Sequence, residues 1–451
     1  MQLKTFKGGV HPQDQKHWTN KVSVTLHIAE GEVIIPLRQH IGAPCEPLVQ
    51  VGDTVKMGQK IGESKSFVSA PVHSSVSGTV TAIKPHPHPG GGEEMCIFIE
   101  NDGKDTLAEE IKNWDLELTP NKIKEYLKTI SPKTVVDKVK EAGITGMGGA
   151  AFPTHVKLSP PPETTITTIV VNGAECEPYL TADHREMLEN AQKIVLGAKM
   201  IKKAVSAIEV IIAIENNKPD AIEAMKHVCK DYSDVSVGIL KTKYPQGSEK
   251  QLIQAITKKQ VPSGALPSAV GIIVNNIDTC VAVAEAVVRN MPLIERVVTV
   301  SGDAVKNPSN LRTRIGVPFY KLIESAGGFI GDPKKVVMGG PMMGIAQNNL
   351  NAPVIKGTSG ILAFKEPQTY GKEEGSCIKC SKCVQVCPMR LMPNYLSVFA
   401  EAKNVEKLNE HHIMDCMECG SCAFICPQRR FMVQHIKAGK TLVREQQAKK
   451  G

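Results

Sequence analysis

Two cysteine motifs near the carboxyl end constrain the fold of this chain more than any other feature. The stretches CIKCSKCVQVCP, starting at Cys377, and CMECGSCAFICP, starting at Cys416, share one spacing, with gaps of two, two and three residues before a proline. This spacing lets one loop of the chain wrap three irons of a cubane cluster, because thiolate sulfur is the ligand that iron–sulfur clusters require. The two motifs therefore predict a domain built around two [4Fe–4S] clusters.

The fourth cysteine of such a motif commonly ligates the other cluster, so the pattern also predicts which thiols share a cluster. One cluster is expected to take Cys377, Cys380, Cys383 and Cys426, and the second to take Cys416, Cys419, Cys422 and Cys387. Structural zinc is the alternative, but zinc usually takes two CxxC pairs separated by a longer loop. The other cysteines lack ligand spacing and are expected to be mostly buried small hydrophobic residues: Cys45, Cys96, Cys176, Cys229 and Cys280.

Length and composition set broader limits. A chain of 451 residues predicts about three domains. No apolar run approaches the roughly 18–20 residues of a membrane span, and the amino-terminal residues lack the apolar core of a secretory signal. We therefore expect a protein of the reducing cytosol, where cysteines serve as metal ligands or stay free. The net charge of +8 and a basic ending suit nucleic acid, anionic lipid or an acidic protein, although a solvated helix and tail is the simpler interpretation.

The amino-terminal part reads as an arm over residues 1–22, a β module over 23–100 and a linker over 101–121. Short β-type runs separated by glycine turns resemble the barrel-sandwich shape of lipoyl and biotinyl carrier domains. The position of the modified lysine falls near Phe67 or Val68, and Lys65 lacks the usual neighbours. We expect a structural module without a carrier lysine.

Residues 122–295 alternate apolar strands with helical stretches, which predicts a parallel sheet covered on both faces. The runs TTIVVNG, VIIAIEN, VSVGILKT and VGIIVNN are the expected strands, and 186–207 has helical periodicity. Residues 296–362 resemble the soluble-ligand-binding β-grasp domain, and 363–451 hold the helical two-cluster, ferredoxin-like domain with its basic tail. The predicted class is thus multidomain α/β, with a Rossmann-like central domain.

Glycines and polar residues gather where ligands bind such a sheet, at the carboxyl ends of its strands. The loop GITGMGGAAFPTHVKL leaves its backbone open to a large planar or phosphorylated ligand. VVNGAECEPYL, YPQGSEKQL and VNNIDT then place polar side chains at or beyond three strand ends.

This set resembles the FMN- and NADH-binding flavoprotein subunit of respiratory complex I. With GGVHP at the start and twin clusters at the end, the order of modules is similar to that of the C subunit of the Rnf complex, an ion-translocating ferredoxin:NAD⁺ oxidoreductase. The resemblance implies FMN contacts at Gly146, Gly148, Gly149, Lys157, Asn172, Glu175, Tyr244, Gly247, Glu249, Asn275, Asn276 and Thr279. It also implies a nicotinamide-nucleotide site near Glu177 and Phe152, where Phe152 stacks on adenine and Glu177 accepts hydrogen bonds.

The chain departs from the complex I pattern at four positions. Met147 replaces an arginine, Ala174 an aspartate and Ser248 a glutamate, and Pro160 stands where a second aromatic would sandwich adenine. These changes affect the nucleotide site more than the flavin site.

The resemblance implies an NADH:ferredoxin oxidoreductase subunit that passes electrons between two [4Fe–4S] clusters and NAD(H) through FMN. A flavin belongs between these partners, because a nicotinamide transfers two electrons at once and a cluster takes one. The expected partners are the other Rnf subunits, ferredoxin acting indirectly, and NAD(H), with no nucleic acid. The expected location is peripheral, on the cytoplasmic face of the membrane, with the basic ending as a candidate contact.

Two other functions are open at this stage. One is a soluble flavin and iron–sulfur cobalamin reductase, although the residues that precede the glycine loop here, GGVHP among them, favour the Rnf family. The other is a non-catalytic cluster relay, which would bind no flavin and reduce no dye with NADH.

Overall fold

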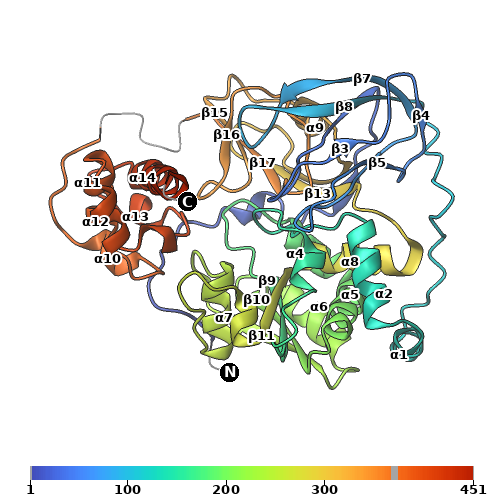
Figure 1. Ribbon diagram of the computed structural model, residues 1–451, viewed down its shortest axis with the longest axis horizontal. Helices are drawn as coiled ribbons and strands as arrows, with labels where there is room; N and C mark the ends of the chain where they lie inside the picture. The colour runs from blue at the N-terminus through green and yellow to red at the C-terminus, as the bar shows by residue number, and fades with distance from the viewer. Residues whose placement is uncertain (1–2, 367–373, 450–451) are drawn as a thin grey trace.

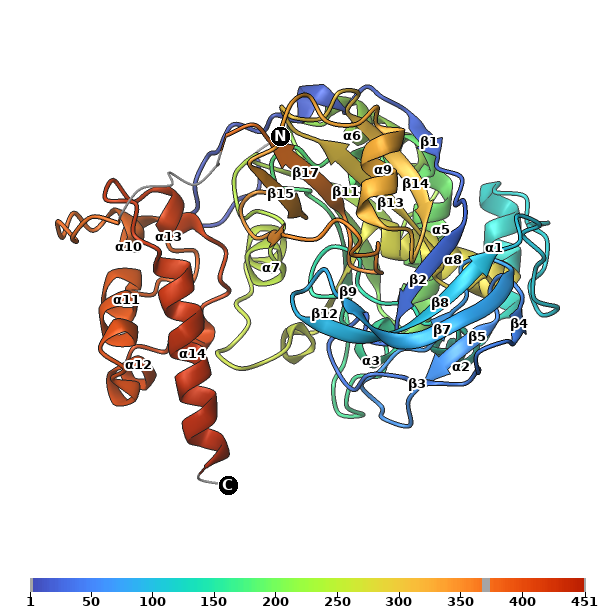
Figure 2. The same ribbon diagram turned by 90° about the horizontal axis from the view of Figure 1, so that it is seen from above.

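The computed structural model describes residues 3–366 and 374–449 of the chain. Four regions are distinct in Figure 1: two β-rich modules, a central α/β domain and a helical domain that holds the cysteine motifs. Figure 2 shows the helices of this cysteine domain gathered on one side of the molecule. The dark blue amino-terminal segment passes between the cysteine domain and the rest of the chain.

The barrel-sandwich module consists of two small antiparallel sheets. Its four-stranded sheet has the order β2-β8-β7-β4 and its three-stranded sheet the order β3-β5-β6. The strands are β2 (Glu32–Pro36), β3 (Glu46–Pro47), β4 (Thr54–Val55), β5 (Lys60–Glu63), β6 (Val72–His73), β7 (Gly78–Pro87) and β8 (Glu93–Asn101). The loop between β5 and β6, where a carrier lysine would stand, lies against the α/β domain, since the Phe67 carbonyl is 3.0 Å from Nε2 of His155. The expected structural module therefore has its tip docked.

The β-grasp sheet has the order β1-β14-β13-β17-β15-β16. Its elements are β1 (Val24–Leu26), β13 (Glu295–Ser301), β14 (Ser309–Arg314), α9 (Phe319–Ser325), β15 (Lys335–Met338), β16 (Ile345–Gln347) and β17 (Gly360–Phe364). Along the chain, β13 and β14 precede α9, and β15, β16 and β17 follow it. The sheet extends beyond the predicted limits of 296–362 at both ends. Strand β1 pairs in parallel with β14, and β17 continues to Phe364. The barrel-sandwich and β-grasp modules also share one hydrophobic core, in which Ile35 and Ile97 pack with Val298 and Phe319.

The α/β domain contains the expected parallel sheet, in the order β11-β10-β9-β12. Its strands are β9 (Thr168–Gly173), β10 (Glu209–Glu215), β11 (Val235–Leu240) and β12 (Ile272–Asn276), at the four predicted runs. The helices around it are α1 (Pro120–Thr129), α2 (Pro132–Glu141), α3 (Thr154–Lys157), α4 (Ala182–Glu189), α5 (Ala191–Ala204), α6 (Pro219–Cys229), α7 (Glu249–Thr257) and α8 (Ile277–Arg289), with the 3₁₀ turn η2 (Pro267–Val270). Buried apolar residues of the strands and of α5 and α8 form its core.

One predicted helix is two. The periodicity over 186–207 continues across Asn190, but this residue has a non-helical backbone that ends α4 and begins α5. Its side-chain amide donates to Oε2 of Glu186 at 2.8 Å. Asparagine forms local hydrogen bonds that compete with the helical ladder, which explains why apolar periodicity alone did not reveal the break.

The cysteine domain is helical, as predicted. It comprises α10 (Lys382–Val386), α11 (Pro393–Glu401), α12 (Val405–Glu410), the 3₁₀ turn η3 (Ile413–Asp415), α13 (Ser421–Phe424) and α14 (Met432–Ala448). Leu396, Leu408, Ile413 and Ile436 are fully buried between these helices. Of the five scattered cysteines, four are buried as expected and Cys176 is half-buried.

Close packing of α5 on α8 depends on Gly197. A Cβ atom at this position would stand 1.8 Å from the carbonyl oxygen of Cys280, which is backbone and cannot move aside cheaply. We predict that Gly197→Ala lowers the free energy of unfolding by about 1–3 kcal/mol, because the helices must separate. Urea denaturation followed by far-UV circular dichroism measures this loss. Glu223→Ala, on the exposed face of α6, is the control, and an unchanged midpoint for Gly197→Ala would contradict the prediction.

Candidate functional site: two cysteine pockets and a sheet edge

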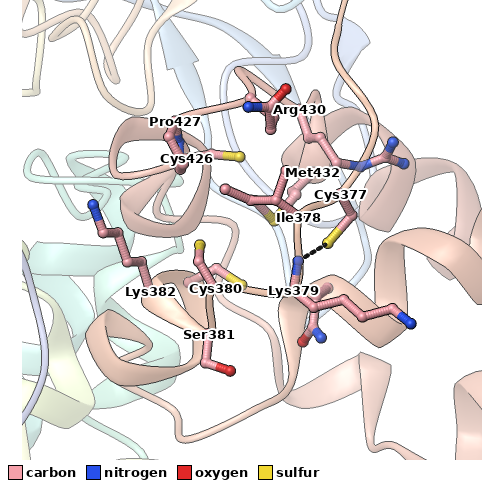
Figure 3. A pocket seen from close by; sticks show the side chains of 13 residues that line it. Cys377, Ile378, Lys379, Cys380, Ser381, Lys382, Cys426, Pro427, Arg430 and Met432 are labelled. Carbon is pink, nitrogen blue, oxygen red and sulfur yellow. Dashed lines mark hydrogen bonds between the residues drawn. The ribbon is translucent and has the colours of Figure 1, made fainter.

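The eight motif cysteines line two separate pockets. The pocket that we call the outer cysteine site is lined by Cys377, Cys380, Cys383 and Cys426. Figure 3 shows Cys377 and Cys380 on one loop, with Cys426 across the pocket beside Pro427. Cys377 and Cys380 are exposed, whereas Cys383 is buried. The outer site therefore reaches the protein surface.

The second pocket, the inner cysteine site, is lined by Cys387, Cys416, Cys419 and Cys422. Apolar side chains such as Leu391 and Leu396 complete its wall. Two backbone amides point at its sulfur atoms, from Leu391 to Cys387 at 3.3 Å and from Glu418 to Cys416 at 3.4 Å. The structure thus brings together the two crossed groups of thiols that the spacing predicts, and cluster ligation by them stays a prediction.

The inner site fits a metal cluster on chemical grounds. Burial raises the pKa of the Cys416 thiol to about 11, and burial likewise raises the pKa of Cys422. Four thiolates confined to one apolar pocket would repel one another strongly without a cation. Bound iron supplies that positive charge and keeps the ligating thiols deprotonated, while amide hydrogen bonds to sulfur influence the potential of a cluster.

The inner site faces the α/β domain. The hydroxyl of Tyr244, which is buried, donates to the carbonyl oxygen of Cys419 at 2.8 Å. The hydroxyl of Ser248 lies 3.6 Å from the sulfur of Met417. Both contacts come from the segment that joins β11 to α7, at the carboxyl edge of the sheet. The inner site is therefore the one adjacent to the predicted flavin residues.

Most of those predicted residues meet at this same edge. Asn172 at the end of β9 and Asn276 at the end of β12 are opposite each other in register. The Asn172 amide donates to the carbonyl of Gly247 at 2.8 Å, which ties β9 to the segment after β11. Lys157 from α3 reaches the edge too, with Nζ at 2.9 Å from Glu249 and 3.1 Å from the carbonyl of Val274. We call this set of strand ends the sheet edge.

The glycine loop is fastened to α8 beside the sheet edge. The hydroxyl of Thr279 accepts from the amide of Met147 at 3.1 Å, and a Cβ at Gly148 would stand 2.9 Å from Nδ2 of Asn276. Gly146 donates its amide to the carbonyl of Phe152 at 2.8 Å, which closes the loop. A Cβ at Gly149 would meet no atom of residues 3–366 and 374–449 within 4 Å, so the loop is open at that point.

Buried polar atoms at the sheet edge are left for a ligand. The side-chain nitrogen of Asn275 is buried and has no hydrogen-bond partner among residues 3–366 and 374–449. A buried amide without a partner costs free energy, so such a group indicates a missing polar ligand. Together with the open Gly149, this atom fits the predicted binding of a flavin at the sheet edge.

Gln246 also has buried side-chain atoms that lack a hydrogen-bond partner among the described residues, and the sequence analysis did not single it out. Its side chain is fully buried, and neither amide atom has a partner within the described parts of the chain. Gln246 lies between Tyr244, which contacts the inner site, and Gly247, which contacts Asn172. The only signal in the sequence is this position in YPQGSEKQL, since glutamine itself is not diagnostic of cofactor binding.

Two other predicted residues have structural contacts. The backbone of Glu175 is left-handed (φ 44°), and its carboxylate accepts from the amide of Asp183 at 2.8 Å and lies 3.6 Å from Nζ of Lys16. Phe152 is half-buried just before α3. Lys16 is a further residue that sequence reasoning did not single out, because its role depends on the arm folding back over the α/β domain.

Glu177 lies where the α/β domain meets the β-grasp module. Its carboxylate accepts from the amides of Met342 and Met343, at 3.0 and 2.9 Å, in the loop between β15 and β16. Each carboxylate oxygen can accept more than one hydrogen bond, so a nucleotide would have to share these oxygens with the loop. The nucleotide roles of Glu177 and Phe152 remain predictions.

Comparison with known proteins agrees with this layout. Four families match along the chain, described as "RnfC Barrel sandwich hybrid domain" (4–104), "Nuo51 FMN-binding domain" (139–285), "SLBB domain" (297–346) and "4Fe-4S dicluster domain" (376–429). Over 96% of its length the chain is 48% identical to the C subunit of the proton-translocating ferredoxin:NAD(+) oxidoreductase complex of Clostridium ljungdahlii, and it covers 93% of that protein. It is 46% identical to the C subunit of the Na(+)-translocating complex of Acetobacterium woodii, over 99% of this chain and 98% of the relative.

The chain belongs to this family of C subunits. The C subunit of the ion-translocating oxidoreductase complex of Yersinia enterocolitica is more distant, at 38% identity over 91% of this chain and 57% of that protein. Among solved structures, an NAD⁺-reducing [NiFe]-hydrogenase in the H₂-reduced state aligns over 72% of this chain and 64% of that chain, with TM-score 0.47 and 18% identity. The family and its order of domains confirm the predicted fold class and the FMN-binding and two-cluster domains.

Crossed ligation of the two cysteine sites gives a clear prediction. The double variant Cys377→Ala/Cys426→Ala removes two ligands of the outer site alone, so we expect it to retain about half of the iron. Cys377→Ala/Cys387→Ala removes one ligand from each site and should lose most of the iron. Iron and sulfide analysis after anaerobic reconstitution measures both, with Cys229→Ala as the control. The reverse order of iron contents would mean that each motif holds its own cluster.

Burial of Glu177 predicts a pH dependence of stability. Burial raises its pKa from 4.5 to about 7, while the two amides, Lys16 and Tyr244 act in the opposite direction. Between these pH values the unfolded chain has released the proton that the folded chain keeps. The contribution of Glu177 to the free energy of unfolding therefore falls as the pH rises from 4.5 toward 7, by roughly 3 kcal/mol in total, and the folded protein becomes less stable.

Glu177→Gln should remove this loss. Relative to wild type, we expect the variant apoprotein to be more stable at pH 8 than at pH 5, as measured by its melting temperature. Glu163→Gln, at an exposed carboxylate, serves as the control. A stability difference between Glu177→Gln and wild type that does not change with pH would contradict the prediction.

Proposed function

We propose that this chain is the peripheral electron-transfer subunit of a membrane-bound, ion-translocating ferredoxin:NAD⁺ oxidoreductase. It passes electrons between two [4Fe–4S] clusters and NAD(H) through FMN. One observation carries the proposal: the segment after β11 contacts the inner cysteine site through Tyr244 and Cys419 and the sheet edge through Gly247 and Asn172. A single short segment thus touches both candidate cofactor sites.

FMN and the clusters supply the redox chemistry when bound, the flavin exchanging two electrons with a nicotinamide and single electrons with a cluster. The protein binds and orients them. At the sheet edge, Asn275 offers an amide donor that has no partner among the described residues, and Lys157 adds positive charge beside Glu249. Gly148 packs closely against the side chain of Asn276, while a Cβ at Gly149 would meet none of the described atoms within 4 Å, so the backbone is open to the ligand at Gly149.

The exposure of the two cysteine sites indicates the order in which electrons pass through them. The inner site packs against the α/β domain, and the outer site lies farther out with Cys377 and Cys380 exposed. Lys379 and Lys382 stand exposed beside these thiols. We assign the outer site to exchange with partner subunits and the inner site to exchange with FMN.

Membrane attachment would occur through other subunits of the complex, from the cytoplasmic side. Within the described residues, no helix is long and apolar enough to cross a membrane. The basic end of the chain remains a candidate contact, but only in part. Lys440 on α14 is buried and donates to the carbonyl of Cys416 and to Glu418, so it serves the inner site instead. Exposed Lys437 and Arg444 are the residues available for docking.

Anaerobic purification followed by flavin and iron analysis tests the proposed function. We expect one FMN and two [4Fe–4S] clusters per chain, and bleaching of the flavin by NADH in preference to NADPH. Bound clusters without flavin would favour the non-catalytic relay. Reduction of a corrinoid as a preferred substrate would favour the cobalamin reductase.

Phe152 tests the nucleotide site separately. If its ring stacks on adenine, Phe152→Ala should raise the KM for NADH about tenfold while FMN stays bound, because aromatic stacking is worth about 1 kcal/mol or more. Phe152→Tyr keeps the ring and should behave like wild type in steady-state kinetics. Loss of FMN from Phe152→Ala would show that this residue belongs to the flavin site instead.

A further inference from the structure

The GGVHP segment of the amino-terminal arm lies between the α/β domain and the cysteine domain. The arm begins along the edge of the parallel sheet. There the amide of Lys4 donates to the carbonyl of Ile239 at 3.0 Å, and the amide of Lys241 donates to the carbonyl of Lys4 at 2.9 Å. The arm thereby extends the sheet beyond β11. It then leaves the sheet and turns toward the inner cysteine site.

Two consecutive glycines make the contact with the cysteine domain. The amide of Gly9 donates to the carbonyl of Val386 at 2.7 Å, in the residue before the inner-site thiol Cys387. The next residue, Val10, exchanges two hydrogen bonds with Tyr244, both 2.8 Å long. The arm therefore contacts Tyr244 and the chain around Cys387 at the same time, while Tyr244 itself holds Cys419.

Only glycine fits at these two positions. Gly8 and Gly9 have φ values of +86° and +79°, which L side chains rarely adopt. A Cβ at Gly9 would stand 2.5 Å from the carbonyl oxygen of Tyr244, and one at Gly8 would stand 2.9 Å from that of Cys387. Both obstacles are backbone atoms, so a side chain at either position must push the arm, Tyr244 or the inner site out of place.

The far end of the arm is anchored on the α/β domain. Buried Lys16 donates to the carbonyl of Glu177 at 3.0 Å, and Tyr179 donates its amide to the carbonyl of Asp14 at 2.8 Å. With Lys4 on the sheet and Lys16 beyond the motif, the arm is fixed on both sides of Gly8 and Gly9. A segment held at two points can act as a brace for whatever its middle contacts.

We propose that GGVHP is a positioning element that fixes the inner cysteine site at the sheet edge, with Gly8 and Gly9 as its positioning residues. The proposal rests on the proposed function, in which electrons pass between these two sites. Transfer between bound centres is highly sensitive to their separation and orientation, and small displacements of reacting groups lower rates strongly. The brace holds the separation that the pair requires.

Gly9→Ala tests the brace, and Gly91→Ala is its matched control. Gly91 also has a left-handed backbone (φ +100°), but a Cβ there would meet none of the atoms that the structure describes within 4 Å. Both substitutions thus place alanine on a left-handed backbone, but only Gly9→Ala disturbs the contact with Tyr244. Holoprotein with measured iron and flavin contents is used for each.

Hydrogen–deuterium exchange is the readout that does not depend on activity. We expect faster amide exchange in Gly9→Ala around residues 384–391 and 243–248, with no change in the barrel-sandwich module. Rapid-mixing spectroscopy with NADH then separates two steps. Flavin bleaching should keep its wild-type rate, whereas the subsequent reduction of the clusters should slow about tenfold or more. Gly91→Ala should match wild type in both measurements.

Several outcomes overturn the proposal. Unchanged exchange and unchanged cluster reduction in Gly9→Ala would show that the arm positions nothing. Slower flavin bleaching with normal cluster reduction would place its effect at the nucleotide site. If Gly9→Ala cannot retain FMN, the milder Gly8→Ala decides, and loss of FMN there too would make the arm a folding element of the α/β domain. Wild-type protein without NADH-dependent bleaching would instead refute the proposed function.

Discussion

The hydrogen bond from the buried Tyr244 hydroxyl to the Cys419 carbonyl is the contact on which the arrangement of the two candidate redox regions depends. It joins the carboxyl edge of a parallel sheet, where flavin contacts were predicted, to a loop that carries thiols of the inner site. Other contacts converge on the same point: Val10 pairs with the Tyr244 backbone, and Glu177 interacts with both Tyr244 and the loop of the β-grasp sheet. Four parts of the chain therefore meet around one side chain.

Motif spacing predicted much of this molecule because its chemistry is local. The spacing of the cysteines, with Cys387 and Cys426 each assigned to the site of the other motif, predicted which thiols line each pocket. Continuous apolar runs predicted the four parallel strands. The placement of Asn172 and Asn276 beside each other could be predicted because parallel strands end at one edge of the sheet.

Contacts between distant segments could not be predicted in this way. Nothing in the residues of β1 shows that it pairs with β14 instead of the barrel-sandwich strands, because short β-type runs do not specify their partners. The burial of Lys440 beside Cys416 could not be predicted for a similar reason, because it depends on how α14 packs. Gln246 carries no recognisable pattern, and it draws attention because its buried side chain has no hydrogen-bond partner in the described parts of the chain.

The pairing of β1 with β14 has a consequence during protein synthesis. Val24 leaves the ribosome about 290 residues before its partner Asn310. At ~5–20 residues per second this interval is roughly 15–60 s. For that time the core shared by the barrel-sandwich and β-grasp modules is incomplete, and the first strands expose apolar surface while the α/β domain is translated between them. Nascent chains of this protein therefore need protection from aggregation until the β-grasp strands emerge.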